Sequence, residues 1–272
     1  MKRCHLKGLG GAILLTCLGG GLCGCPPIYG VDTATEIVTE QAALVSNATV
    51  AVVNSNGEIR ITGGAVENVV IEAEKRVDVH RNAANLDTEP EEFLAELEVL
   101  VTSDEGGVTV ETVVPAGFWL QGVVAQVDYD ITVPAQVPLD LEVANGGVYV
   151  DGVQGMMAID VANGEVECLS VGGNLDITVA NGSVDITHPV ALAADESMAC
   201  DVQNGSIEIA LPAASNFDVE AYVTVGGIDT GGFDFDVNTY NLVGQHANDT
   251  VGTGGATIDL DVELGGVTFQ RL

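Results

Sequence analysis

Carboxylates are the residues of this sequence with the most chemical potential. The chain holds 40 Asp and Glu residues against 8 Lys and Arg, which gives a formal net charge of −32. Such a charge repels phosphate backbones and excludes nucleic acid as a partner. Glu167, Asp185 and Glu208 occupy the same position in successive copies of a repeated sequence. This pattern is typical of a solvated acidic face with no cofactor; Ca²⁺, which prefers carboxylate oxygens, is the alternative at these three residues.

The other groups that could carry catalysis are sparse. His80, His188 and His246 are isolated, with no second histidine or cysteine at ligand spacing, so we expect them at the surface. No lysine or arginine lies between Arg81 and Arg271, which excludes a polysaccharide lyase with a basic side chain as its base. The sequence therefore predicts a protein that is not an enzyme and has no catalytic residue. The alternative is a carbohydrate-active protein that binds polysaccharide or hydrolyses it with paired carboxylates.

The N-terminus reads as an export signal. Lys2, Arg3 and Lys7 precede a short apolar stretch, which falls below the roughly 20 residues needed to span a bilayer. Leu22-Cys23-Gly24-Cys25 resembles a bacterial lipobox. The resemblance implies that residues 1–24 are a signal peptide, that the Cys25 sulfur carries lipid, and that a membrane is a partner. An ordinary secretory signal is the alternative. Pro26, where an aspartate would favour the inner membrane, favours the outer membrane or cell surface of the envelope.

The chain after Cys25 divides into three segments. Residues 25–46 form a tether that runs into a first strand, residues 47–134 form a β-rich part with one short helix, and residues 135–272 form a repeat region. The helix is expected to begin with Thr88 as N-cap and Pro90 in its first turn. Alternating apolar residues and an Asn56-Gly57 turn signal predict the strands of the middle segment, at 48–61, 69–79, 98–103, 107–114 and 123–133.

The repeat region is marked by Asn-Gly pairs that recur every 18 to 23 residues. A period near this length indicates stacked coils, because one unit cannot bury its apolar face alone. We therefore predict an all-β fold with a right-handed parallel β-helix, or solenoid; tandem hairpins are the alternative. Weaker copies occur at 50–59, 217–229 and 258–267. The corners are expected to hold an amide ladder and glycines in the left-handed conformation, at Asn145-Gly146, Asn163-Gly164, Asn181-Gly182 and Asn204-Gly205.

The same register places the two cysteines of the repeat region. Cys168 falls on the strand after a corner and Cys200 on the strand before one. They would lie on different walls, beyond the roughly 7 Å between Cα atoms that a disulfide allows. Both are expected to be buried thiols.

These motifs together resemble a family of bacterial putative adhesins, a β-solenoid group of undefined function. The resemblance covers residues 36–272. It rests on the segments Asn54–Ile59, VIEAEKRV from Val70, the short helix, DYDITVPAQVPLDLEVANG from Asp128, and the repeated Ala-Asn-Gly corners. It implies a non-catalytic interaction or structural surface in the cell envelope, with an unknown protein or glycan as ligand.

Overall fold

The computed structural model describes residues 30–45, 48–81 and 87–272. Within those residues the chain forms seventeen strands, one α-helix and one short 3-10 helix, so the all-β class with one short helix is confirmed. The predicted signal peptide and the lipidated Cys25 lie outside the described residues.

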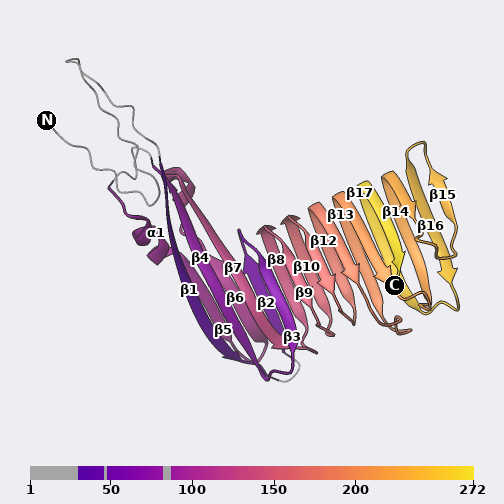
Figure 1. Cartoon of the computed structure of the whole chain (residues 1–272), viewed down its shortest axis with the longest axis horizontal. Coiled ribbons are helices and arrows are strands. Elements are labelled where there is room, and N and C mark those ends of the chain that lie inside the picture. Colours follow the sequence, from indigo (N-terminus) through magenta and orange to yellow (C-terminus); the bar gives the residue numbers. More distant parts are fainter. Residues whose placement is uncertain (1–29, 46–47, 82–86) are drawn as a thin grey trace, which may run out of the picture.

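The strands join into one sheet that bends back on itself and is nearly closed around a single core (Figure 1). We call its two halves the first and second walls. Across the first wall lie β5 (Glu98–Ser103), β6 (Gly107–Val113), β2 (Thr49–Asn54), β8 (Leu139–Asn145), β10 (Met157–Asn163), β16 (Gly244–Val251) and β15 (Val237–Tyr240). Across the second lie β1 (Val31–Ala43), β4 (Asn68–His80), β7 (Val123–Pro134), β3 (Ile59–Gly64), β9 (Val148–Asp151) and β11 (Val166–Leu169). Four long strands bend at a corner and belong to both walls: β12 (Leu175–Thr187), β13 (Ser197–Leu211), β14 (Phe217–Asp229) and β17 (Ala256–Arg271).

Equivalent positions of the repeats lie side by side in parallel pairing. Met157 pairs with Leu139 on one side and Leu175 on the other, and the register continues through Met198 to Ile258. The order of the repeats differs from a regular stack. β17 lies between β13 and β14, and β2–β3 lies against β8–β9. Pairing is antiparallel at both ends of the sheet. The prediction of a regular stack of coils is therefore wrong in the order of the repeats and in the pairing at the two ends of the sheet.

Alternation within each strand builds the core. Leu139, Leu141 and Val143 point inward, and the residues between them point outward, because successive side chains of a strand face opposite sides. Cys168 and Cys200 are buried and unpaired on different walls, as predicted. Burial raises the pKa of the Cys168 thiol to about 12.

Aromatic side chains fill the core near the C-terminal end of the sheet. Phe217 and Phe269 stack with ring centroids 6.1 Å apart, and Phe233 meets Phe217 edge-on at 5.4 Å. Arg271 lies over the Phe233 ring at 4.8 Å. Four of the six phenylalanines of the sequence, Phe217, Phe233, Phe235 and Phe269, thus pack together where the regular repeats end.

The helix α1 (Pro90–Glu96) packs at the opposite end. Its N-cap is Glu89, whose side chain makes no capping hydrogen bond, so the prediction of Thr88 is wrong by one residue. Buried Lys75 holds the C-terminal end: its Nζ donates to the carbonyls of Leu94 and Leu97 at 3.4 and 3.1 Å. Nζ also pairs with Glu36 at 2.5 Å. One ammonium group therefore joins α1, β4 and β1, and satisfies carbonyls that a helix end leaves unpaired.

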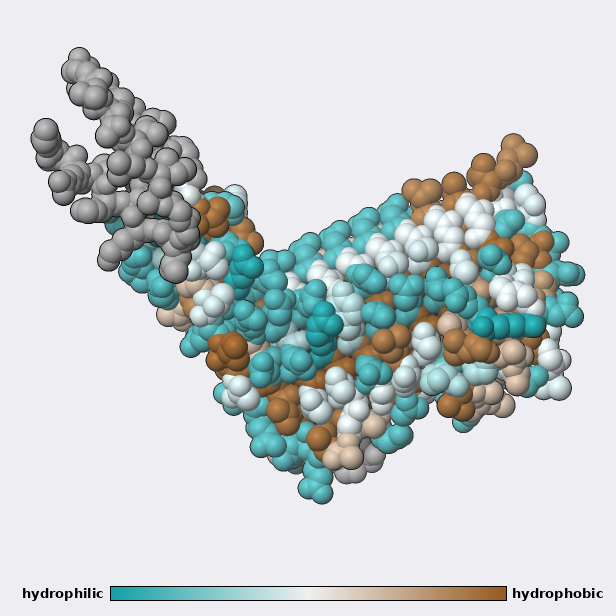
Figure 2. Space-filling model, viewed as in Figure 1, coloured by the Kyte–Doolittle hydropathy of each residue, from teal (hydrophilic) through white to brown (hydrophobic). Residues whose placement is uncertain are grey.

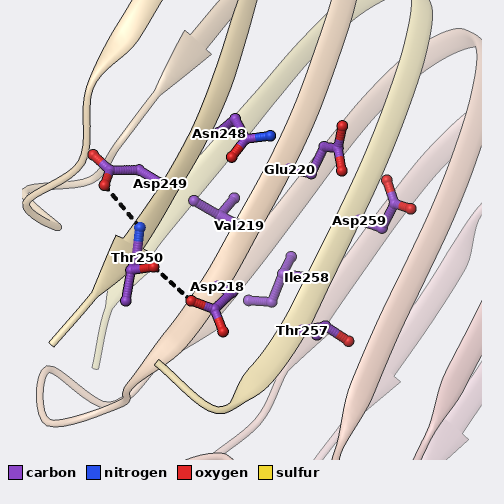
Figure 3. Close-up of a pocket in the computed structure, with 9 residues that line it drawn as sticks. All are labelled: Asp218, Val219, Glu220, Asn248, Asp249, Thr250, Thr257, Ile258 and Asp259. Carbon is purple, nitrogen blue, oxygen red and sulfur yellow. Dashed lines mark hydrogen bonds between the residues drawn. The ribbon is translucent and has the colours of Figure 1, made fainter. Parts of the chain in front are cut away.

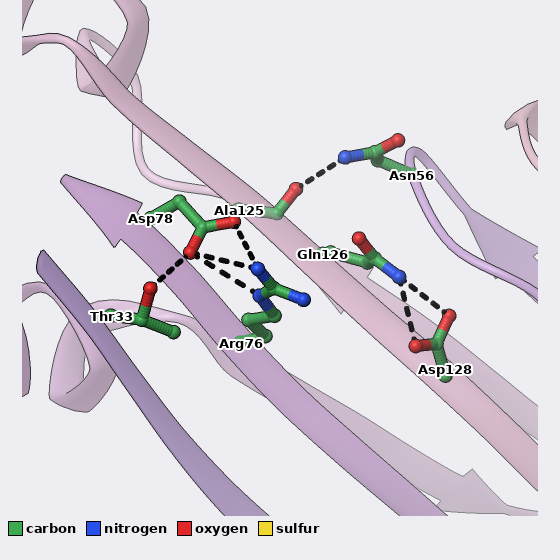
Figure 4. Close-up of polar contacts among 7 residues, drawn as sticks. All are labelled: Thr33, Asn56, Arg76, Asp78, Ala125, Gln126 and Asp128. Carbon is green, nitrogen blue, oxygen red and sulfur yellow. Dashed lines mark hydrogen bonds and ion pairs between the residues drawn. The ribbon is translucent and has the colours of Figure 1, made fainter. Parts of the chain in front are cut away.

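Polar contacts fix the β2–β3 pair beside β7. Buried Asn54 occupies a core position next to Val143; its Oδ1 accepts from the Thr112 hydroxyl at 2.9 Å, and that hydroxyl lies 2.7 Å from the Tyr129 hydroxyl. In the bend that follows, Asn56 donates to the Ala125 carbonyl at 2.8 Å (Figure 4). Because a buried amide must find partners, these contacts specify where this copy of the repeat inserts.

Candidate binding surfaces on the two walls

The Asn-Gly corners form a continuous amide ladder along the bend that joins the first wall to the second. Nδ2 of Asn163, Asn181 and Asn204 each donates to Oδ1 of the preceding asparagine, at 3.2, 3.1 and 3.2 Å. Asn145 begins the ladder and donates to the Ser55 carbonyl. Figure 2 shows that this bend is hydrophilic along most of its length and hydrophobic at its C-terminal end. The exposed apolar residues there are Leu264, Val225, Val243 and Leu242. The asparagines hold repeats together and are structural residues.

Glycines beside the ladder make the close approach possible. Gly146, Gly182 and Gly205 have φ of 145°, 152° and 156°, and a Cβ on Gly164 or Gly182 would lie 1.8 or 1.6 Å from the backbone oxygen of the preceding glycine. No L side chain fits there.

The acidic column on the second wall consists of Glu167, Asp185 and Glu208, which lie directly side by side on β11, β12 and β13. Partial burial and the neighbouring Glu208, Glu165 and Glu167 raise the pKa of Asp185. Beyond Glu167 the row continues to Tyr149. The Arg60 guanidinium lies over the Tyr149 ring, with its Cζ 4.4 Å from the ring centroid. Among the described residues no group of three or more His, Cys, Asp or Glu is arranged to hold a metal ion.

A groove of about 710 Å³ lies near the C-terminal end of the sheet, lined by β14, β16 and β17 (Figure 3). We call it the C-terminal groove. Seven of its nine lining residues are polar and four of these are acidic; the lining consists of Asp218, Val219, Glu220, Asn248, Asp249, Thr250, Thr257, Ile258 and Asp259.

Two aspartates of the C-terminal groove accept hydrogen bonds from the residues around it. Asp218 accepts from the Thr250 hydroxyl at 2.6 Å and from the Gly255 amide at 3.2 Å, and these bonds lower its pKa. Asp249 accepts from the amides of Asp236 and Thr250 at 3.0 and 2.8 Å, which lowers its pKa too. Both carboxyls therefore stay ionised and shape the groove.

Tyr222 and His246 form an aromatic pair on the same face, one row of side chains from the groove. Their rings stack with centroids 4.5 Å apart, and the neighbouring Glu220 of the groove lining raises the pKa of the Tyr222 hydroxyl. No sequence pattern indicates this pair, because β16 belongs to no repeat and only its antiparallel pairing with β14 joins the two residues.

His188 is buried, which contradicts its predicted place at the surface. Its Nδ1 lies 2.6 Å from the Val190 carbonyl oxygen, and its Nε2 lies 3.8 Å from Glu196 Oε1. Glu196 in turn accepts from the amides of Gly173 and Ala193. The pair closes the loop that lengthens this repeat from 18 to 23 residues.

No protein-family model and no curated protein matches the sequence. Among solved structures, a putative cell adhesion protein from Clostridium sporogenes is 13% identical, with a TM-score of 0.48 over 89% of this chain and 100% of its own. A putative adhesin from Bacteroides fragilis is 12% identical, with a TM-score of 0.31 over 86% and 97%. A putative lipid binding protein from Parabacteroides distasonis is 10% identical, with a TM-score of 0.29 over 86% and 96%. Similarity at this level leaves the function to be argued from the residues of this chain.

In the part of the chain that the structure describes, no helix is both long and apolar enough to cross a membrane.

Proposed function

We propose that this chain is an exported bacterial envelope protein, held to the outer membrane or cell surface by lipid on Cys25. Its β domain acts as a non-catalytic, adhesin-like interaction surface. We further propose that the domain is a right-handed parallel β-solenoid with an inserted C-terminal strand, since right-handed crossovers are the rule between parallel strands.

The observation that carries this proposal is the position and chemistry of the C-terminal groove. The groove lies at the end of the sheet opposite β1, where the described chain begins (Figure 1). A tether before Gly30 would therefore leave the groove directed away from the membrane. Glu220, Asn248 and Asp259 offer hydrogen-bonding groups to sugar hydroxyls, and the Tyr222–His246 pair beside them offers a surface for the apolar face of a sugar ring.

The ligand we propose is a glycan that is neutral or carries amines. The acidic lining disfavours uronate or sulfate groups by charge repulsion. Carboxylate-based glycoside hydrolysis remains the second candidate, since paired acids lie on this face. A hydrolase needs one carboxylic acid with a raised pKa. The pKa values of Asp218 and Asp249 are lowered, so neither can supply that acid. The acid with a raised pKa on this face is Asp261, which pairs with Tyr222 outside the groove lining.

A glycan array probed with the full chain tests this proposal. We expect binding to neutral or amine-bearing glycans that falls at least about tenfold in Tyr222→Ala and in Asp259→Asn, the size of an effect near 1.4 kcal/mol. Asp140→Asn is the matched control, because Asp140 occupies the same row of the first wall on β8, outside the groove. Equal loss in the control would refute the groove as the binding site. Release of reducing sugar would establish the hydrolase instead.

A further inference from the structure

An uncharged, apolar tip projects from the N-terminal end of this acidic domain. Residues 112–127 contain no charged side chain, although the chain as a whole carries a net charge of −32. At the centre of this stretch lies the 3-10 helix η1 (Phe118–Gln121), in which Trp119 and Leu120 are 77% and 66% exposed. Large apolar side chains exposed side by side on an otherwise polar surface mark an interaction site.

The fold holds the tip in a defined conformation. Phe118 is buried, and its ring meets that of Phe93 in α1 edge-on at 5.6 Å. Gly117 and Gly122 frame the 3-10 helix in the left-handed conformation, with φ of 97° and 73°. Phe118 therefore anchors the 3-10 helix in the core, and the next two residues are presented outward. We call Trp119 and Leu120 the apolar tip.

The apolar tip lies where the described chain begins. The His80 amide donates to the Gly122 carbonyl at 2.8 Å, and His80 pairs with Val31 in β1. The Arg81 amide donates to the Gly30 carbonyl at 3.0 Å. Side-chain contacts reinforce the position of β1, since Thr33 donates to Asp78 of β4 at 2.5 Å (Figure 4). The entry point of the chain is therefore fixed beside the tip.

The distance to the proposed anchor is short. From Cys25 to Gly30 the chain spans at most about 18 Å when fully extended, at ~3.6 Å per residue. A lipid on Cys25 would thus keep this end of the domain within reach of the bilayer surface.

We propose that the apolar tip inserts into the interfacial region of the phospholipid bilayer and sets the orientation of the domain on the membrane. This inference rests on the proposed lipid anchor. Charge selects this occupant: the acidic walls are repelled by anionic headgroups, whereas the uncharged tip can enter the interface without desolvating an ion. Tryptophan prefers that region because its ring is apolar and its N–H can remain hydrogen-bonded. The C-terminal groove, at the other end of the sheet, then faces outward.

The chain supplies its own reporter, because Trp119 is its only tryptophan. The full chain is expressed in a bacterial host, and mass spectrometry determines whether Cys25 carries lipid. The lipidated protein is then reconstituted into phosphatidylcholine vesicles with and without lipid brominated near the headgroup. We expect blue-shifted tryptophan emission that the brominated lipid quenches.

Two matched variants keep the reporter and change only one exposed leucine. Leu120→Asp should abolish the quenching and shift the emission to the red, because it places a charge in the tip. Leu242→Asp, at a residue 96% exposed between β15 and β16 at the far end of the sheet, should leave the quenching unchanged. Both side chains are exposed, so we expect both variants to melt like the wild type.

Each other outcome overturns the inference and identifies which part fails. Absence of lipid on Cys25 removes the proposed anchor and the inference with it. Lipid on Cys25 without quenching leaves the anchor and refutes insertion of the tip. A blue shift without quenching shows that protein, either a second copy or another segment of this chain, covers Trp119. Quenching that persists in Leu120→Asp refutes the tip as the inserted element.

Discussion

Gly182 illustrates the tightest constraint at the scale of single residues. Its φ is 152°, and a Cβ would lie 1.6 Å from the Gly164 oxygen and 2.7 Å from its carbonyl carbon. The obstacle is backbone in the bend between β10 and β11, where the Gly164 amide donates to the Asn181 carbonyl at 2.9 Å, so it cannot move as a side chain could. We predict that Gly182→Ala lowers the free energy of unfolding by roughly 2–4 kcal/mol, the range of strain and overpacking effects together. Urea denaturation measures this loss.

Gly64→Ala is the control for this substitution. Gly64 ends β3, has no left-handed φ, and a Cβ there would meet only the Thr132 methyl at an ordinary 3.7 Å. We expect a change within about 0.5 kcal/mol, as for a position without special constraint. Similar losses of stability in both variants would show that the close contacts between the corner glycines do not set the spacing of the repeats.

The sequence allowed the corner residues to be placed because Asn and Gly each have a specific backbone preference there. Asn54 and His188 were beyond such reasoning. Asn54 replaces a core valine, and its amide is satisfied by two partners distant in sequence, the Thr112 hydroxyl and the Val127 carbonyl. His188 is buried because the loop to Glu196 folds over it. Both depend on tertiary partners, which local patterns do not contain.

At the scale of elements, the acidic column places like charges on neighbouring strands. Partial burial, together with the adjacent carboxylates, raises the pKa of Asp185 in the folded state. The folded protein then binds this proton more tightly than the unfolded chain does. The stability that this group contributes is therefore present at low pH and is lost as the pH rises above its unfolded value, about 4, and through the folded pKa.

We predict that Asp185→Asn stabilises the protein at neutral pH and low salt. Relief of repulsion between directly opposed strands is worth roughly 0.2–1 kcal/mol. The gain should shrink at high NaCl, since salt screens exposed charges. Thermal melts at several salt concentrations measure both effects.

Calcium binding at the acidic column would reverse the effect of Asp185→Asn on stability. If the acidic column binds Ca²⁺, CaCl₂ should raise the melting temperature of the wild type by several degrees, chelator should reverse it, and Asp185→Asn should become the less stable chain. Ligand that binds only the folded state stabilises it, by about 2.7 kcal/mol at one hundred times its dissociation constant. If CaCl₂ acts no differently from NaCl at equal ionic strength, the column is a solvated acidic face.

Most strands were predictable at this scale because apolar residues alternate regularly within the strand segments between residues 48 and 61 and between residues 139 and 211. The order of the strands was not. The copies at 217–229 and 258–267 carry the same pattern, so each fits equally well beside β13. The choice of β17 depends on how β14 is held on its other side by β16, and on the phenylalanines shared by β14 and β17. Those contacts form only in the assembled fold.

For the whole molecule, this order means that the C-terminal strand lies inside the sheet rather than at its end. β17 pairs with β13 over residues 257–271 and with β14 over residues 256–268. In a regular repeat array, removal of the last unit costs one interface. Here removal of β17 would break two interfaces, expose the edge of β13, and detach β14, β15 and β16 from the rest of the sheet.

We therefore predict that a chain ending at Gly255 loses cooperative unfolding across its C-terminal half and becomes protease-sensitive from about residue 197 onward. Limited proteolysis with mass spectrometry, alongside circular dichroism, locates the loss. A peptide of residues 256–272 added to the truncated chain should restore protection, because β-strand addition to an open sheet edge supplies the missing hydrogen bonds. The same peptide with Val262→Asp, which puts a charge at a fully buried position, should not. Protection of the truncated chain without any peptide would instead mean that β14 can pair directly with β13, and that the inserted strand is dispensable to the fold.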